Sequence, residues 1–265
     1  MRLADQDTYR TDPLRPRPLL TRLFLSRPFT FYPQLIHIIW RNGRKAKQGR
    51  YSSTVWASSS LDVLVALENI GARFEIDGML NIGSFDGPAV FIGNHMSTLE
   101  TLVLPAIIQP VKELTFVVKR SLIVTPLFGP IMRSRNPILV NRTNPREDLK
   151  TVLEEGTRKL QSGISVAIFP QSTRSAVFDP AQFNSLGVKL ALKAGVPVVP
   201  VALKTDAWGN GKLVKDFGKL DVSKTIRFSF GAPMQVSGRG ADEHQAVIGF
   251  IRDRLNAWKE EEHKS

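Results

Sequence analysis

Two short apolar runs, each followed at once by polar residues, constrain the fold of this 265-residue chain most strongly. The run 89–92 leads into Asn-His-Met-Ser-Thr-Leu-Glu at 94–100, and the run 166–169 leads into Pro-Gln-Ser-Thr-Arg-Ser at 170–175. Apolar runs of this length predict buried strands. In α/β sheets, reactive groups gather beyond the carboxyl ends of such strands, so the two polar loops are the first candidates for a site.

Strand and helix patterns alternate along most of the chain, which predicts an α/β fold. Two prolines in the run 196–203 suggest an edge strand or strand ends, and residues 1–20 are expected to be irregular. The predicted helices are 30–45, 52–70 (separated near Gly49), 97–108, 146–161, 185–193 and 246–258. The predicted strands are 74–82 (with a break at Gly78), 89–92, 114–119, 138–141, 166–169, 196–203 and 226–230.

Positive charge is concentrated at the N-terminus. The chain carries a net charge of +12, and residues 1–50 hold eleven Arg or Lys against three Asp, a surplus of eight. This asymmetry indicates a basic arm that faces a polyanion, although a solvated basic tail explains the charge equally well. We expect an N-terminal membrane-associating region at 1–70 and a catalytic domain at 71–265.

Apolar residues are interleaved with this basic charge. The longest uncharged stretch, Pro28 to Trp40, has thirteen residues, whereas a membrane-spanning helix needs about 20. Basic residues follow it directly, a pattern typical of an anchor in an anionic membrane surface. A helix packed on the protein body is the structural alternative.

Composition and motifs exclude several classes of protein. The chain has no cysteine, so disulfides, thiolate nucleophiles and cysteine-based zinc sites are excluded. The absence of cysteine is also compatible with a reducing compartment. Residues 1–17 lack the apolar core of a cleaved secretory signal. No Gly-x-Ser-x-Gly string occurs, which argues against a serine hydrolase. Since most excess charge lies in the apolar arm, we expect no nucleic-acid partner.

His95 is the histidine best placed for chemistry. It lies in the polar loop just after the first buried run, and Glu100 lies five residues further on. Glu100 could orient one imidazole nitrogen of His95 and leave the other as a base, as the acid of a catalytic triad does. Ser97 and Glu100 also form a capping box, in which Glu100 would only stabilise the start of a helix. The two roles are compatible.

Cations follow three of the predicted strands. Arg174 lies beside Ser172 and Thr173, while Lys119 and Arg142 end the strands 114–119 and 138–141. A guanidinium can grip a phosphate through two hydrogen bonds. One such cation is often an ordinary surface charge, but three at equivalent strand ends favour an anion site.

Four ordered blocks resemble the glycerolipid (lysophospholipid) acyltransferase family, over roughly 74–230. His95 with Glu100 matches the family's His-x4-Asp block with Glu for Asp, and 169–175 matches Phe-Pro-Glu-Gly-Thr-Arg-Ser with Gln171 for Glu and Ser172 for Gly. The segments 137–142 and 196–201 match the second and fourth blocks, with Lys119 matching an upstream Lys. A second string, Glu155-Gly156-Thr157-Arg158, spells the third block but lies inside a predicted helix, so we assign the site to 169–175.

The resemblance implies a mixed central sheet flanked by helices and direct acyl transfer without a metal or bound cofactor. His95 would be the general base and Glu100 its orienting acid. The substrate-binding residues would be Lys119, Arg142, Gln171, Ser172, Thr173 and Arg174.

The same resemblance implies an acyl-CoA or acyl carrier protein donor and a lysophospholipid acceptor. We expect the chain to act peripherally on the cytoplasmic face of the cell membrane. The variant residues at 100, 171 and 172 leave open a different lipid acceptor, or a diverged, non-catalytic lipid-binding protein.

Overall fold

The computed structural model describes residues 3–16, 27–171, 173–211 and 216–264. Its centre is an eight-stranded sheet in the order β1-β2-β8-β7-β3-β6-β4-β5. β1 is antiparallel to β2, and β7 is antiparallel to β8, while the other neighbours are parallel. The strands are β1 (Tyr9–Arg10), β2 (Arg73–Asp77), β3 (Val90–Gly93), β4 (Leu114–Lys119), β5 (Ile138–Val140), β6 (Ser165–Ile168), β7 (Val198–Lys204) and β8 (Thr225–Phe230).

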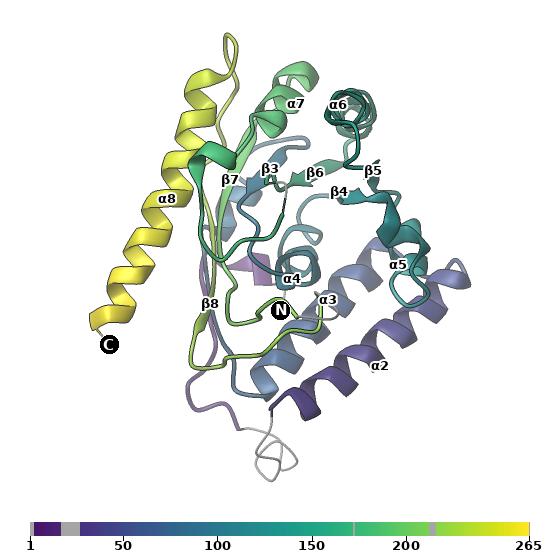
Figure 1. The fold of residues 1–265 in the computed structure, drawn as a ribbon, viewed down its shortest axis with the longest axis vertical. Helices are drawn as coiled ribbons and strands as arrows, with labels where there is room; N and C mark the ends of the chain where they lie inside the picture. Colours follow the sequence, from purple (N-terminus) through teal and green to yellow (C-terminus); the bar gives the residue numbers. More distant parts are fainter. Residues whose placement is uncertain (1–2, 17–26, 172, 212–215, 265) are drawn as a thin grey trace.

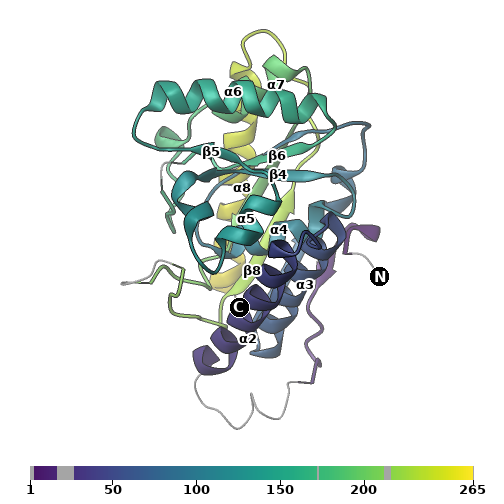
Figure 2. The same ribbon diagram turned by 90° about the vertical axis from the view of Figure 1, so that its right-hand side faces the viewer.

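Helices cover both faces of this sheet (Figures 1 and 2). On one face, α2, α3 and α4 bury their apolar side chains, and on the other α6, α7 and α8 do so. The α-helices are α2 (Arg27–Lys47), α3 (Ser53–Asn69), α4 (Leu99–Ile108), α5 (Gly129–Ser134), α6 (Pro145–Gln161), α7 (Leu186–Ala194) and α8 (Ala241–Lys264). Short 3-10 helices are η1 (Leu3–Asp5), η2 (Met79–Ile82), η3 (Arg120–Val124) and η4 (Pro180–Gln182).

Alternation along the central strands supplies both cores. In β3, Phe91 belongs to the core under α3 and α4, whereas Val90 and Ile92 belong to the core under α6 and α7. Successive side chains of a strand point to opposite faces, so an uninterrupted apolar run is what a strand covered on both sides requires. The predicted α/β fold with a mixed sheet between helices is confirmed.

β7 corrects the expectation of an edge strand. It lies between β8 and β3, and Pro200 is paired in register with Ile92. The Pro200 carbonyl accepts a hydrogen bond from Gly231, just beyond the end of β8. Because the N–H and C=O of one strand residue point to the same side, the N–H that proline lacks would have faced this segment rather than β3. The proline is therefore tolerated in an interior strand.

Other element boundaries also differ from expectation. The predicted strand 74–82 does break at Gly78, which has φ +72°, but η2 follows it in place of a continued strand, so β2 ends at Asp77. A Cβ on Gly78 would lie 2.1 Å from the Phe230 carbonyl oxygen, so only glycine permits this turn. Within residues 1–20, expected to be irregular, the structure forms η1 and β1. The helix α5 was not predicted.

α2 packs against the protein body along one face. Phe31, Leu35 and Ile39 are buried in the same core as α3 and β2, whereas Ile36 and Trp40 are 43% and 51% exposed. The inner face of α2 is thus packed on the protein body, as the structural alternative predicted. Phe24 and Leu25, two further apolar residues among the basic residues of the predicted anchor, lie outside the described residues. Among the helices that the structure describes, none is long and apolar enough to cross a membrane.

Candidate active site

Two loops from neighbouring parallel strands meet at His95. β3 and β6 are paired with Ile92 opposite Ile168, so their carboxyl ends lie side by side. The His95 ring stacks on Phe169, with ring centroids 4.6 Å apart and an angle of 10° between the planes. The His95 N–H donates to Gln171 Oε1 at 2.6 Å, and the His95 carbonyl accepts from the Ser175 N–H at 2.9 Å. The second loop therefore fixes the ring and the backbone of His95.

Glu100 contacts the imidazole of His95 directly. Its Oε2 lies 3.0 Å from His95 Nδ1. The Glu100 side chain is fully buried and the His95 side chain is 12% exposed. Because Nδ1 faces the carboxylate, Nε2 is the ring nitrogen that Glu100 does not contact. This is the arrangement in which a carboxylate fixes the tautomer of a histidine base.

The N-cap of α4 lies one residue later than the capping box predicted. α4 begins at Leu99 with Thr98 as its N-cap residue, so Ser97 is not the N-cap and Glu100 is the second helical residue. Glu100 Oε1 nevertheless accepts from the N–H groups of Met96 and Ser97, at 2.9 and 2.8 Å. One oxygen of Glu100 thus satisfies backbone donors while the other faces His95. The contacts that the two roles would require are thus both present, on separate atoms of Glu100.

The predicted cations are not equally close to His95. Arg174 comes from the loop that clamps His95, and its Nη1 donates to Asp216 Oδ1 at 2.8 Å. Lys119 is the last residue of β4 and Arg142 lies just beyond β5, and these are the second and third strands beyond β3. Both are exposed. The structure places all three at the same edge of the sheet, but only Arg174 on the loop that contacts His95.

The remaining predicted residues have different surroundings. Gln171 is buried, and its oxygen holds the His95 backbone; this position suits a supporting contact better than direct substrate binding. Thr173 is exposed beside Arg174. Ser172 lies outside the described residues.

The second copy of the third block lies on the other face of the sheet. Residues 155–158 are inside α6, and Leu160 of that helix belongs to the core shared with α7 and α8. A Cβ on Gly156 would meet the Leu190 side chain at 2.7 Å, so this glycine serves close packing of α6 on α7. The string is a helical packing segment and contributes nothing to the His95 site.

Three residues of the site were missed by the sequence reasoning. Asn94 Nδ2 donates to the Leu203 carbonyl, and Asn94 Oδ1 accepts from the Leu203 N–H, which extends the pairing of β3 with β7 beyond the strand. Thr205 donates to Glu100 Oε1. Asp216 pairs with Arg174. Asn94 could have been found as the neighbour of His95, whereas nothing in the local sequence marks Thr205 or Asp216.

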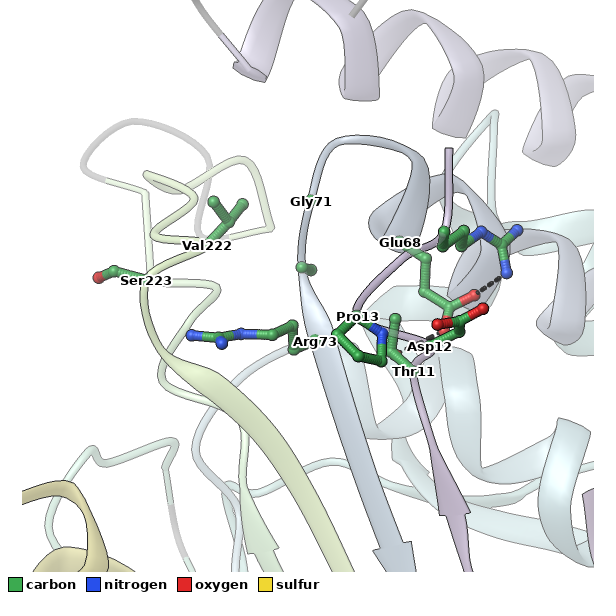
Figure 3. Close-up of a pocket in the computed structure, with 10 residues that line it drawn as sticks. Thr11, Asp12, Pro13, Glu68, Gly71, Arg73, Val222 and Ser223 are labelled. Atoms are coloured by element: carbon green, nitrogen blue, oxygen red, sulfur yellow. Dashed lines mark hydrogen bonds and ion pairs between the residues drawn. The ribbon is translucent and has the colours of Figure 1, made fainter. Parts of the chain in front are cut away.

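A pocket of about 360 Å³ lies away from His95 (Figure 3). One wall is the segment around Thr11, which is tied to α3 because Glu68 accepts from Tyr9, Thr11 and Arg15 at 2.6–2.7 Å. Burial and the Glu68 carboxylate raise the pKa of Tyr9. Figure 3 shows Arg73 extending toward Val222 and Ser223 across the pocket. The lining contains no residue of the His95 site.

Comparisons with known proteins point to one family. The family model described as acyltransferase matches residues 67–204. A 1-acyl-sn-glycerol-3-phosphate acyltransferase of Pseudomonas aeruginosa is 32% identical over 191 residues, which cover 72% of this chain and 69% of that protein. A chloroplastic 1-acyl-sn-glycerol-3-phosphate acyltransferase of Arabidopsis thaliana is 29% identical over 64% of this chain, and the match spans 44% of its length.

A solved structure has the same fold. The crystal structure of the 1-acyl-sn-glycerophosphate acyltransferase PlsC from Thermotoga maritima matches with a TM-score of 0.67 and 20% identity, over 88% of this chain and 95% of that chain. The family match covers more than half of the 265 residues. On these grounds the chain belongs to the acyltransferase family.

Proposed function

We propose that the chain transfers a fatty acyl group from a thioester donor to a hydroxyl of a lysophospholipid, with 1-acylglycerol 3-phosphate as the first acceptor to test. The observation that carries this proposal is the buried Glu100 carboxylate 3.0 Å from His95 Nδ1 at the carboxyl end of β3. It leaves Nε2 of a partly exposed imidazole as a general base. The relatives named 1-acyl-sn-glycerol-3-phosphate acyltransferases support this acceptor.

In the proposed reaction, His95 Nε2 removes the proton of the acceptor hydroxyl as its oxygen attacks the thioester carbonyl. The resulting imidazolium is stabilised by the Glu100 carboxylate. The tetrahedral intermediate collapses with expulsion of the thiolate, which takes up the proton. Backbone N–H groups of the loop at 171–174 are our candidates for stabilising the oxyanion.

Arg174 is the proposed phosphate ligand. It is the cation on the loop that contacts His95, and a guanidinium binds phosphate through two parallel hydrogen bonds. Lys119 and Arg142 at the neighbouring strand ends would add charge for the acceptor phosphate or the donor phosphates. The donor is acyl-CoA or acyl carrier protein, and the surplus of positive charge in the chain suits either.

We also propose peripheral attachment to the cytoplasmic face of the cell membrane through α2. Support comes from its outer face, where Ile36 and Trp40 are exposed beside Arg41 and Arg44. Arg44 lies 5.0 Å from the centre of the Trp40 ring. An aromatic with adjacent arginines is typical of helices that lie in the interface of an anionic bilayer.

The experiment is an acylation assay with purified chain, acyl-CoA and acyl carrier protein thioesters in parallel, and a panel of lysophospholipids in mixed vesicles. His95→Ala should lower turnover by about 10²–10⁴-fold while the protein remains folded. Binding of lysophospholipid without turnover in the wild type would instead support the non-catalytic alternative.

A further inference from the structure

Glu100 divides its two oxygens between different tasks. Oε2 faces His95, whereas Oε1 accepts from Met96 N–H, Ser97 N–H and the hydroxyl of Thr205. The two amides belong to the same loop as His95, but Thr205 lies 105 residues further along the chain. One contact that sets the orientation of Glu100 therefore comes from a different part of the sheet.

The hydrogen bonds around the Thr205 hydroxyl fix the direction in which it donates. It is fully buried, and its oxygen accepts from Ser97 Oγ at 3.0 Å. The Ser97 oxygen in turn accepts from the Leu99 N–H at 3.2 Å. Since an ionised carboxylate can only accept, the single proton of Thr205 points to Oε1. The donors run in one direction, from Leu99 through Ser97 and Thr205 to Glu100.

Thr205 is placed next to Glu100 because it directly follows the last residue of β7. β7 is paired with β3 as far as Gly93 opposite Val201, and Asn94 then forms two hydrogen bonds with Leu203. Because Asn94 immediately precedes His95, the same contacts fix the histidine loop relative to β7. Thr205 follows two residues after Leu203 and donates to the same Glu100 oxygen as the loop amides.

We propose that Thr205 is a positioning residue of the reaction, which holds Glu100 so that Oε2 remains against His95. The inference rests on the proposed function, because it assigns a role within the same site. A glutamate side chain has one more rotatable bond than an aspartate and needs more contacts to be held in one rotamer. A buried carboxylate also needs hydrogen-bond donors to remain charged. Thr205 meets both requirements.

The test compares Thr205→Val with Thr205→Ser and with Thr115→Val. Valine keeps the shape and removes the hydroxyl, whereas serine retains it. Thr115 is a matched control: it is 1% exposed, and its hydroxyl is 3.3 Å from the carbonyl oxygens of Arg135 and Asn136, away from His95. We expect Thr205→Val to lower kcat roughly tenfold to a hundredfold, with little change in KM, because the base is misplaced. Thr205→Ser should restore most of the rate, and Thr115→Val should retain it.

A second readout does not depend on activity. The proton NMR resonance of His95 Nδ1–H, assigned by its loss in His95→Gln, should lie downfield in the wild type, Thr205→Ser and Thr115→Val, and should move or disappear in Thr205→Val. A Thr205→Val protein that keeps both this resonance and the wild-type kcat would overturn the proposal, as would failure of serine to rescue. Absence of the wild-type resonance at low temperature would contradict the His95–Glu100 bond and the proposal with it. If the wild type acylates nothing, the proposed function fails, and the resonance alone decides the role of Thr205.

Discussion

The guanidinium of Arg174 is paired with the carboxylate of Asp216, with Nη1 and Oδ1 2.8 Å apart. Thr98, the N-cap residue of α4, donates to the same Asp216 oxygen at 2.6 Å. The segment that carries Asp216 is held against α2, because Tyr32 donates to the Gly218 carbonyl and its ring lies 5.2 Å from Phe217. In this structure the Asp216 carboxylate is therefore the ion-pair partner of Arg174, the residue that we propose as the ligand of the substrate phosphate.

Asp216→Asn should therefore lower KM for 1-acylglycerol 3-phosphate. The phosphate and the Asp216 carboxylate compete for Arg174, and the neutral amide competes less. The pair is 21% and 38% exposed, and exposed ion pairs contribute about 0.2–1 kcal/mol, so we expect a gain of up to about fivefold. Steady-state kinetics measure it, with a neutral monoacylglycerol acceptor expected to be unaffected. The control is Asp221→Asn on the same segment, where the carboxylate accepts hydrogen bonds from the N–H and hydroxyl of Ser223. A higher KM in Asp216→Asn would show that Asp216 orients Arg174 for the substrate.

Arg174→Lys should raise KM for the phosphorylated acceptor. Lysine keeps the charge but loses the planar pair of donors that grips a phosphate. We expect about a tenfold change, which corresponds to ~1.4 kcal/mol. The matched control is Arg158→Lys in the helical copy of the block on α6. If Arg158→Lys is the damaging change and Arg174→Lys is silent, the assignment of the third block to 169–175 is wrong.

Sequence reasoning located the elements around His95 because their signals are local. The apolar runs at 89–92 and 166–169 each became a strand covered on both faces. The helix 146–161 is found at Pro145–Gln161, with Asn144 capping it through hydrogen bonds to the first turn. Length, alternation and capping residues are all readable within a few positions.

The rest depends on contacts between distant segments. The interior place of β7 follows from its pairing with β3 and β8, and the local signal from Pro200 suggested an edge. Thr205 contacts Glu100 from more than 100 residues further along the chain. Asp216 contacts Arg174 from about 40 residues further along. A lone threonine or aspartate is too common to mark such a role. The inner face of α2 was ambiguous because an apolar stripe fits a protein core and a membrane surface equally well.

Removing the exposed apolar side chains of α2 should weaken binding to anionic vesicles. Deleting residues 1–50 is unsuitable, because it would also remove the buried Phe31, Leu35 and Ile39, each worth about 1.5–3 kcal/mol. The double variant Ile36→Ser with Trp40→Ala leaves this face intact. Sedimentation with phosphatidylglycerol vesicles should show less bound protein, and Leu192→Ser, at a 38% exposed position on α7, should bind like the wild type. Equal binding of all three proteins would argue against membrane contact through α2.

Substitutions of Glu100 separate its two tasks. Glu100→Gln keeps the shape but has a single oxygen, so it cannot accept from the Met96 and Ser97 amides and also stabilise an imidazolium at His95. We expect kcat to fall by about 10²-fold or more with a smaller effect on KM. Glu100→Asp retains the charge but is one methylene shorter, so it cannot reach His95 while its other oxygen remains on the loop amides and Thr205. We expect roughly a tenfold loss of kcat, although the family's common residue is restored.

The control for the capping task is Glu243→Gln in the first turn of α8. Glu243 Oε1 accepts from the N–H and hydroxyl of Ser237 at 2.9 Å, so it has a capping role outside the His95 site. That variant should lower the melting temperature slightly and keep turnover. If both Glu100 variants behave in the same way, with a modest loss of stability and unchanged kcat, then Glu100 serves only the start of α4. His95 would then act as a base without a carboxylate partner, and the dyad would have to be abandoned.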